Sequence, residues 1–118
     1  MTRRSRSATL LCVCLLITSG TGCLSGSDAK QRALDAEETH LSAGFENAPC
    51  VESWGTSSPV VEAESSVINR TDGSVYVEVR HPYFYGTNST EEDGASEAVY
   101  RVTADSETRV SGDIVVPC

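Results

Sequence analysis

The sequence predicts an α+β or mainly β fold, an antiparallel sheet of four or five strands with one N-terminal helix, preceded by a signal peptide. Two patterns lead to this fold class. Apolar and polar residues alternate in the second half of the chain, most clearly over residues 74–80, and a period of two is typical of strands with one buried face. An upstream stretch rich in Ala, Leu, Gln and Glu favours a helix. At 118 residues, the chain has room for one domain.

Residues 1–22 have the layout of a signal peptide. Three arginines are followed by an apolar run over residues 8–17 and then by small residues. The positive start stays on the inner face of the membrane while the run inserts. A helix of ten residues reaches about 15 Å, half of the hydrocarbon core, so a permanent span is disfavoured. Arg3-Arg4 is similar to a twin-arginine export signal, and both the Sec and the twin-arginine routes stay open.

The junction of Gly22 and Cys23 resembles a lipobox, the motif at which lipoproteins are cleaved before a cysteine that carries diacylglycerol. Gly20 departs from that motif, in which Leu or a similar residue is expected. We therefore expect lipid on Cys23, a lipid-anchored tether over residues 23–30 and a small acidic β-rich domain over residues 31–118. The expected location is the cell membrane, with the domain facing the extracellular side and the lipid as the contact with the membrane.

The number of cysteines supports lipidation. After removal of the leader, Cys23, Cys50 and Cys118 remain, and an odd thiol is a liability in an oxidising compartment. Acylation of Cys23 leaves the other two as a pair, so we expect a disulfide between Cys50 and Cys118. The alternatives join Cys23 to Cys50 or to Cys118, and each of them leaves a free thiol outside the cell.

The first element expected in the domain is a helix from residue 28 to about residue 42. Asp28 can act as its N-cap, and good helix-forming residues follow. Leu34, Leu41 and Phe45 recur at spacings of seven and four, which gives a narrow apolar stripe. This stripe would lie against the sheet, and the alternative is that the segment forms a solvated linker.

Beyond Pro49 the pattern changes to strands. They are expected over residues 50–54, 60–69, 74–80 with an extension over 83–85, 98–103 and 108–116. Asp72-Gly73 readily takes the positive φ of a hairpin turn. Residues 86–96, which are acidic at positions 91–93, are expected to form a polar loop.

The charge of the chain narrows the class of partner. All 17 acidic residues follow residue 27, and three of the nine basic residues belong to the leader. The mature chain therefore has six basic and 17 acidic residues, a net charge of −11. Such a surface repels phosphate backbones, which argues against nucleic acid as a partner. A single lysine among so many carboxylates is typical of halophilic proteins, which work in salt that screens their charge.

The sequence predicts no catalytic residue, no metal site and no cofactor. His40 and His81 are the only histidines, and neither has other ligands at metal spacing. No serine lies in Gly-x-Ser-x-Gly, so a hydrolase would need one of these histidines beside an acid and a serine. Two N-glycosylation sequons begin at Asn69 and Asn88, both in predicted loops of an exported chain, and these asparagines are candidate glycosylation sites.

A patch that binds sugar or peptide is the main candidate for function. It would be lined by four aromatic residues: Trp54, Tyr83, Phe84 and Tyr85. The alternative is that these rings are core residues or cross-strand partners, the more common role of aromatic residues on strands.

The chain resembles a small uncharacterised family of haloarchaeal lipoproteins. The similar features are the Arg3-Arg4 leader, Gly22-Cys23, Asn69-Arg70-Thr71, His81-Pro82-Tyr83 and the ending Pro117-Cys118. The family has no assigned activity, so the resemblance implies location and halophily only. The leading hypothesis is a lipid-anchored cell-surface protein with a binding or accessory structural role at the envelope, whose protein or small-molecule partner is unknown. The alternatives are a freely secreted ligand-binding module and a small hydrolase.

Overall fold

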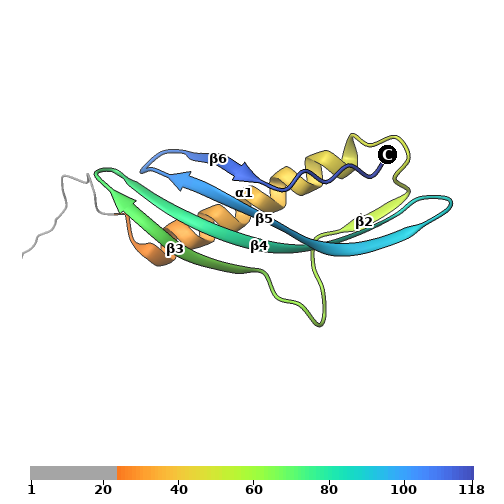
Figure 1. The fold of residues 1–118 in the computed structure, drawn as a ribbon, viewed down its shortest axis with the longest axis horizontal. Helices are drawn as coiled ribbons and strands as arrows, with labels where there is room; N and C mark the ends of the chain where they lie inside the picture. The colour runs from red at the N-terminus through yellow and green to blue at the C-terminus, as the bar shows by residue number, and fades with distance from the viewer. Residues whose placement is uncertain (1–23) are drawn as a thin grey trace, which may run out of the picture.

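The computed structural model describes residues 24–118 and shows one helix packed along a five-stranded antiparallel sheet (Figure 1). In chain order the elements are α1 (Gly26–Glu46), β2 (Ser53–Gly55), β3 (Glu64–Thr71), β4 (Ser74–Gly86), β5 (Glu91–Val102) and β6 (Glu107–Gly112). The predicted α+β fold with an N-terminal helix is confirmed. The predicted signal peptide over residues 1–22 and Cys23 lie outside the described residues. In the described part of the chain, no helix has both the length and the apolar character that a membrane span requires.

Helix α1 begins earlier than the sequence predicted. Its N-cap is Ser25, whose hydroxyl oxygen accepts a hydrogen bond from the Asp28 backbone N–H at 3.0 Å, so the prediction of Asp28 as the cap is wrong. Asp28 instead lies in the first turn, where its negative charge favours the positive end of the helix dipole. Residues 26–30, expected in a tether, are therefore helical. Leu24, just before the cap, already packs against the core.

The buried stripe of α1 differs from the predicted one. It consists of residues spaced four apart: Ala29, Ala33, Glu37, Leu41 and Phe45. Leu34 is only half-buried at the border of this row. A row of residues four apart forms a ridge that fits a groove of the neighbouring layer, and the two alanines allow a close approach of helix and sheet. The row therefore carries a carboxylate into the middle of the core.

The core lies between α1 and the hairpin of β4 and β5. These two strands pair along their whole length, from Val75 opposite Val102 to Gly86 opposite Glu91. The predicted inward face of β4 is confirmed, because Val75, Val77 and Val79 are all buried. They meet the alanines of the helix together with Ala98, Tyr100 and Val102 from β5.

Strand β4 continues through Pro82 because two different strands, β3 and β2, pair with separate parts of the edge that faces away from β5. Strand β3 pairs with β4 as far as Arg80, and β2 pairs with it only from Phe84 onward. Pro82 lies in the gap between them, so its missing N–H removes no hydrogen bond on that side. One long strand thus joins the predicted strand over residues 74–80 to its predicted extension.

The predicted polar loop over residues 86–96 is largely wrong. Residues 91–96 form the first half of β5, and only four residues, 87–90, connect it to β4. Their acidic side chains are exposed, and the register with β4 holds the segment extended. Three other boundaries shift, because β2 starts at Ser53, β3 at Glu64, and β6 ends at Gly112.

The chain after β6 runs to the end of the helix and is fixed there by a disulfide. Cys50 and Cys118 are bonded, with their Cα atoms 5.8 Å apart, which confirms the predicted pair. The backbone N–H of Cys50 also approaches Cys118 Sγ at 3.2 Å. Asp113 joins β5 through its backbone N–H, which donates to the Glu97 carbonyl at 2.8 Å. The last residues are thus fixed at Asp113 and at Cys118.

Candidate functional site

Three of the four predicted patch residues pack inward. The Phe45 ring at the end of α1 lies 5.8 Å from Trp54, 5.7 Å from Tyr83 and 5.4 Å from Tyr85, measured between ring centroids. Such distances are typical of stabilising aromatic pairs. Burial, together with the neighbouring Tyr85 and nearby carboxylates, raises the pKa of Tyr83. These three rings follow the alternative interpretation, as packing partners under the helix.

Phe84 alone faces the opposite side of the sheet. Successive strand residues point to opposite faces, and Phe84 lies between the two inward tyrosines. Its side chain is 44% exposed. The ring rests on Gly55 of β2, where an added Cβ would lie 2.4 Å from a ring carbon, so only glycine leaves room for the ring. Phe84 therefore packs on the backbone of β2 while much of its ring meets solvent.

Phe84 lines a cleft of about 480 Å³ on this outer face, which we call the outer cleft. The loop between β2 and β3 forms one wall through Pro59, Val60 and Val61. Pro82, Phe84 and Ala95 from the β4–β5 hairpin form the opposite side, and Arg80 and Asp93 also line it. A mostly apolar concavity of this size with a few charged groups has the properties of a small-molecule site. The sequence pointed to Phe84, but nothing in it indicated the wall formed by the β2–β3 loop.

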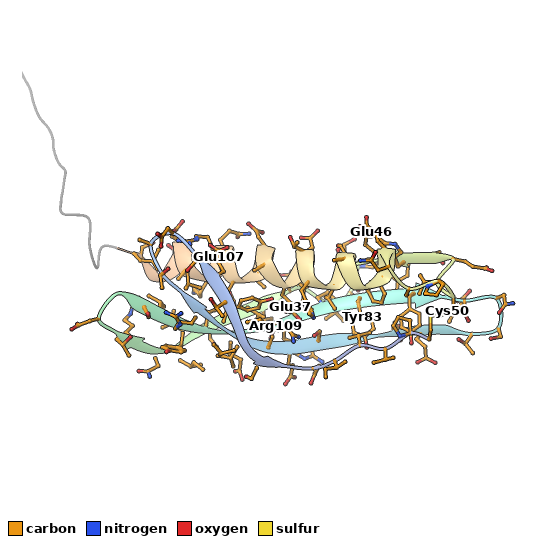
Figure 2. All side chains as sticks on the ribbon, turned by 90° about the horizontal axis from the view of Figure 1, so that it is seen from above. Glu37, Glu46, Cys50, Tyr83, Glu107 and Arg109 are labelled. Atoms are coloured by element: carbon orange, nitrogen blue, oxygen red, sulfur yellow. A yellow bond between two sulfur atoms is a disulfide. The ribbon has the colours of Figure 1, made fainter. Side chains whose placement is uncertain are left out.

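A buried polar cluster lies on the other face, and sequence reasoning missed it. Glu37 is wholly buried between helix and sheet. Its carboxylate accepts hydrogen bonds from Ser96 Oγ at 2.7 Å and Tyr100 Oη at 2.8 Å. Arg109 of β6 completes the set, with Nε 2.9 Å from Oε1 and Nη2 3.1 Å from Oε2 (Figure 2). All four carboxylate contacts are therefore made by side chains of the sheet.

The protonation states of this cluster follow from its contacts. Burial by itself would raise the pKa of Glu37, but the hydrogen bonds from Arg109, Ser96 and Tyr100 outweigh it and leave this pKa below its ordinary value. Burial and the bond to Glu37 raise the pKa of Tyr100 well above its ordinary range. The bond to Glu37 also raises the pKa of Arg109. The cluster thus holds a charged pair and a neutral phenol at neutral pH.

The structure also brings together a serine, a histidine and an acid. His81 lies directly opposite Ser96 in the β4–β5 register, and Ser96 donates to Glu37. The Nδ1 atom of His81 lies 3.1 Å from the Pro82 carbonyl, and the serine proton goes to the carboxylate. Ser96 is wholly buried, so a substrate cannot reach its hydroxyl in this arrangement. His40 is exposed and does not belong to the buried row of α1 that contains Glu37.

The asparagines of the two sequons and the acidic residues at positions 91–93 are exposed. Asn88 is in the short loop between β4 and β5, as predicted, whereas Asn69 is in strand β3 beside a register shift, so its predicted loop position is wrong. Glycosylation at either residue stays a prediction. Within residues 24–118, no group of three or more His, Cys, Asp or Glu side chains is placed to hold a metal ion.

No family model matches this chain, and neither the curated proteins nor the solved structures include a match. The resemblance to haloarchaeal lipoproteins therefore stays a prediction, and the function must be argued from the geometry of the domain.

Proposed function

We propose that this protein is a lipid-anchored cell-surface binding protein, held by lipid on Cys23, whose ligand enters the outer cleft. The observation that carries the proposal is the exposed Phe84 ring, which packs on Gly55 and lines the same cleft as the β2–β3 loop. An exposed aromatic ring inside a concavity is a common anchor for ligands.

The two ends of the domain support this arrangement. The described chain enters at the end where α1 starts beside β3, and β2 lies toward the opposite end (Figure 1). An added Cβ on Gly26 would meet Arg70 of β3 at 2.9 Å, which shows how closely the helix start and β3 approach. Only Leu24 and Ser25 lie between Cys23 and the helix. A lipid on Cys23 would thus hold one end near the membrane and leave the β2 end, with Phe84, farther out.

The chemistry of the cleft favours a sugar ring as the ligand. The apolar face of a sugar can pack on Phe84, while Asp93 and Arg80 offer an acceptor and donors for its hydroxyls. Arg80 is exposed, and its Nε lies 3.4 Å from Glu97 Oε2. Such a surface ion pair is weak, so the guanidinium can give up this contact to bind a ligand.

The anchor is tested by intact mass spectrometry and detergent partition of the native protein. We expect a chain that begins at Cys23, carries a lipid and enters the detergent phase. Cys23→Ser is expected to move the domain to the aqueous phase and the culture medium. Native protein in the medium with an unmodified Cys23 would favour the freely secreted module, and a chain beginning at Met1 in the cytosol would refute export.

The outer cleft is tested by NMR titration of the soluble domain with hexoses and N-acetylhexosamines. We expect shifts at Phe84 and at the β2–β3 loop. Phe84→Ala should lower the affinity about five- to thirtyfold, because an aromatic contact of this kind contributes about 1–2 kcal/mol. Ile68→Ala is the matched control, since Ile68 is 52% exposed on β3 and does not line the cleft. Equal affinities of the two variants, or no shifts with any of these sugars, would contradict the assignment of the cleft.

A further inference from the structure

Strand β6 leaves one side of its backbone without a partner. In the sheet described for residues 24–118, it pairs with β5 alone and lies at the end of the strand order. An edge strand exposes unpaired N–H and C=O groups that can bind another extended chain. Arg32 of α1 pairs with Glu107 and donates to the Ser106 carbonyl, so the helix covers the start of this strand. The accessible part of the edge is therefore the stretch from Arg109 onward.

An apolar groove of about 380 Å³ adjoins this part of the edge, and we call it the edge groove. Leu41 and Phe45 line it from α1, and Ile114 and Val115 line it from the chain after β6. Figure 2 looks onto this side of the molecule, with Arg109 and Cys50 labelled toward the two ends of the stretch. The groove thus lies between a helix and the continuation of an edge strand.

Large apolar side chains are exposed along the same edge. Val110 is 49% exposed, Ile114 is 83% exposed and Val116 is 71% exposed. Single exposed apolar residues are ordinary, but three within seven positions beside an apolar groove indicate an interaction surface. Together with the open strand, they offer backbone hydrogen bonds and pockets for alternate side chains, the two components of recognition by strand addition.

We propose that a partner protein adds an extended segment to β6, with apolar residues at alternate positions that enter the edge groove and basic residues between them. The basic residues follow from charge complementarity, because residues 24–118 contain six basic and 17 acidic side chains. Arg109 also lines the groove, but its charge is already paired with Glu37, so it does not oppose a basic segment. Residues 24–118 of a second copy would bring another net charge of −11, which opposes self-association.

The probe is a fluorescent heptapeptide in which Val and Arg alternate, capped at both ends. Its binding is measured by anisotropy at moderate ionic strength, where opposite surface charges still attract. Its control is an isomer with the same residues in two blocks, which has equal charge but cannot place every second side chain in the groove. We expect the alternating peptide to bind more tightly. Ile114→Ser is expected to weaken it about tenfold, because an Ile side chain loses most of its apolar contact.

Val60→Ser is the matched control variant, since Val60 is 86% exposed and lines the outer cleft instead. Both substitutions are at exposed positions, so neither is expected to disturb folding. Hydrogen exchange should show slower exchange within Glu107–Gly112 when the alternating peptide is bound, and N-methylation of the peptide backbone should abolish binding. Equal affinity of the two peptides, equal effects of the two variants, or unchanged exchange in β6 would each overturn the proposal.

Discussion

Replacement of Arg109 by Met is expected to lower the free energy of unfolding at pH 7 by about 3–5 kcal/mol. Met retains a long apolar side chain, but it leaves the Glu37 carboxylate buried without its cation. Ser96 and Tyr100 still donate at 2.7 and 2.8 Å, and two neutral hydroxyls cannot offset the cost of a buried charge. Urea unfolding monitored by circular dichroism gives the change in free energy.

Two controls separate the buried pair from a general loss of charge. Arg80→Met removes an exposed pair with Glu97 and should change the free energy by about 1 kcal/mol or less. The double variant Glu37→Gln, Arg109→Met removes both charges of the buried pair and should be more stable than Arg109→Met alone. Similar losses in Arg80→Met and Arg109→Met would mean that the buried cluster has no special role in stability.

The same pair predicts a difference in pH dependence. The pKa of Glu37 in the folded protein is below its ordinary value of 4.5. The ionised Glu37 therefore stabilises the wild type above pH 4.5, and this stabilisation is lost as the pH falls through the folded pKa. Without Arg109, burial raises the pKa of Glu37, and protonation in acid then favours the folded state. We therefore expect the difference in free energy of unfolding between wild type and Arg109→Met to narrow as the pH falls from 7 through 4.5. A gap that stays constant from pH 7 to pH 4 would contradict this account.

The sequence was sufficient for the fold class, because the alternation in β4 and the composition of α1 are local signals. It was not sufficient for Glu37. A glutamate in a helix is normally exposed, and the sequence alone did not indicate that the apolar row runs through its position. The row of Ala29, Ala33, Leu41 and Phe45 was a usable signal, since all four fall at spacings of four around it. Reading only the larger apolar residues, with Leu34 among them, concealed this row.

The candidate site was half predictable for a similar reason. Tyr83, Phe84 and Tyr85 are consecutive, and a period of two already requires that Phe84 points away from both tyrosines. Its separation from them was therefore available from the sequence. The wall formed by the β2–β3 loop was not, because it depends on how this loop folds over Pro82. The sequence also did not predict that residues 91–96 are part of a strand. Their exposed acidic residues show no alternation of apolar and polar positions, and the pairing with β4 holds them extended.

Removal of the disulfide by Cys50→Ser, Cys118→Ser is expected to lower the free energy of unfolding by about 4 kcal/mol. The two cysteines are 68 positions apart, and a bridge across so long a segment strongly reduces the conformational entropy of the unfolded chain. Urea unfolding of the double variant, with the oxidised wild type beside it, measures the change. A loss of less than about 1 kcal/mol would show that the unfolded chain is already compact without the bridge.

The loss of the disulfide should act locally in the folded state as well. Arg109 is in β6, upstream of the final segment, so the contacts of Glu37 remain when the bridge is absent. Ile114 and Val115 lie between Asp113, whose backbone N–H donates to the Glu97 carbonyl, and the disulfide at Cys118. Without the disulfide, this segment is fixed at Asp113 only. The double cysteine variant should therefore bind the alternating peptide more weakly while it keeps the pH dependence that Arg109 confers. Loss of both properties together would mean that the bridge organises the whole domain rather than this edge.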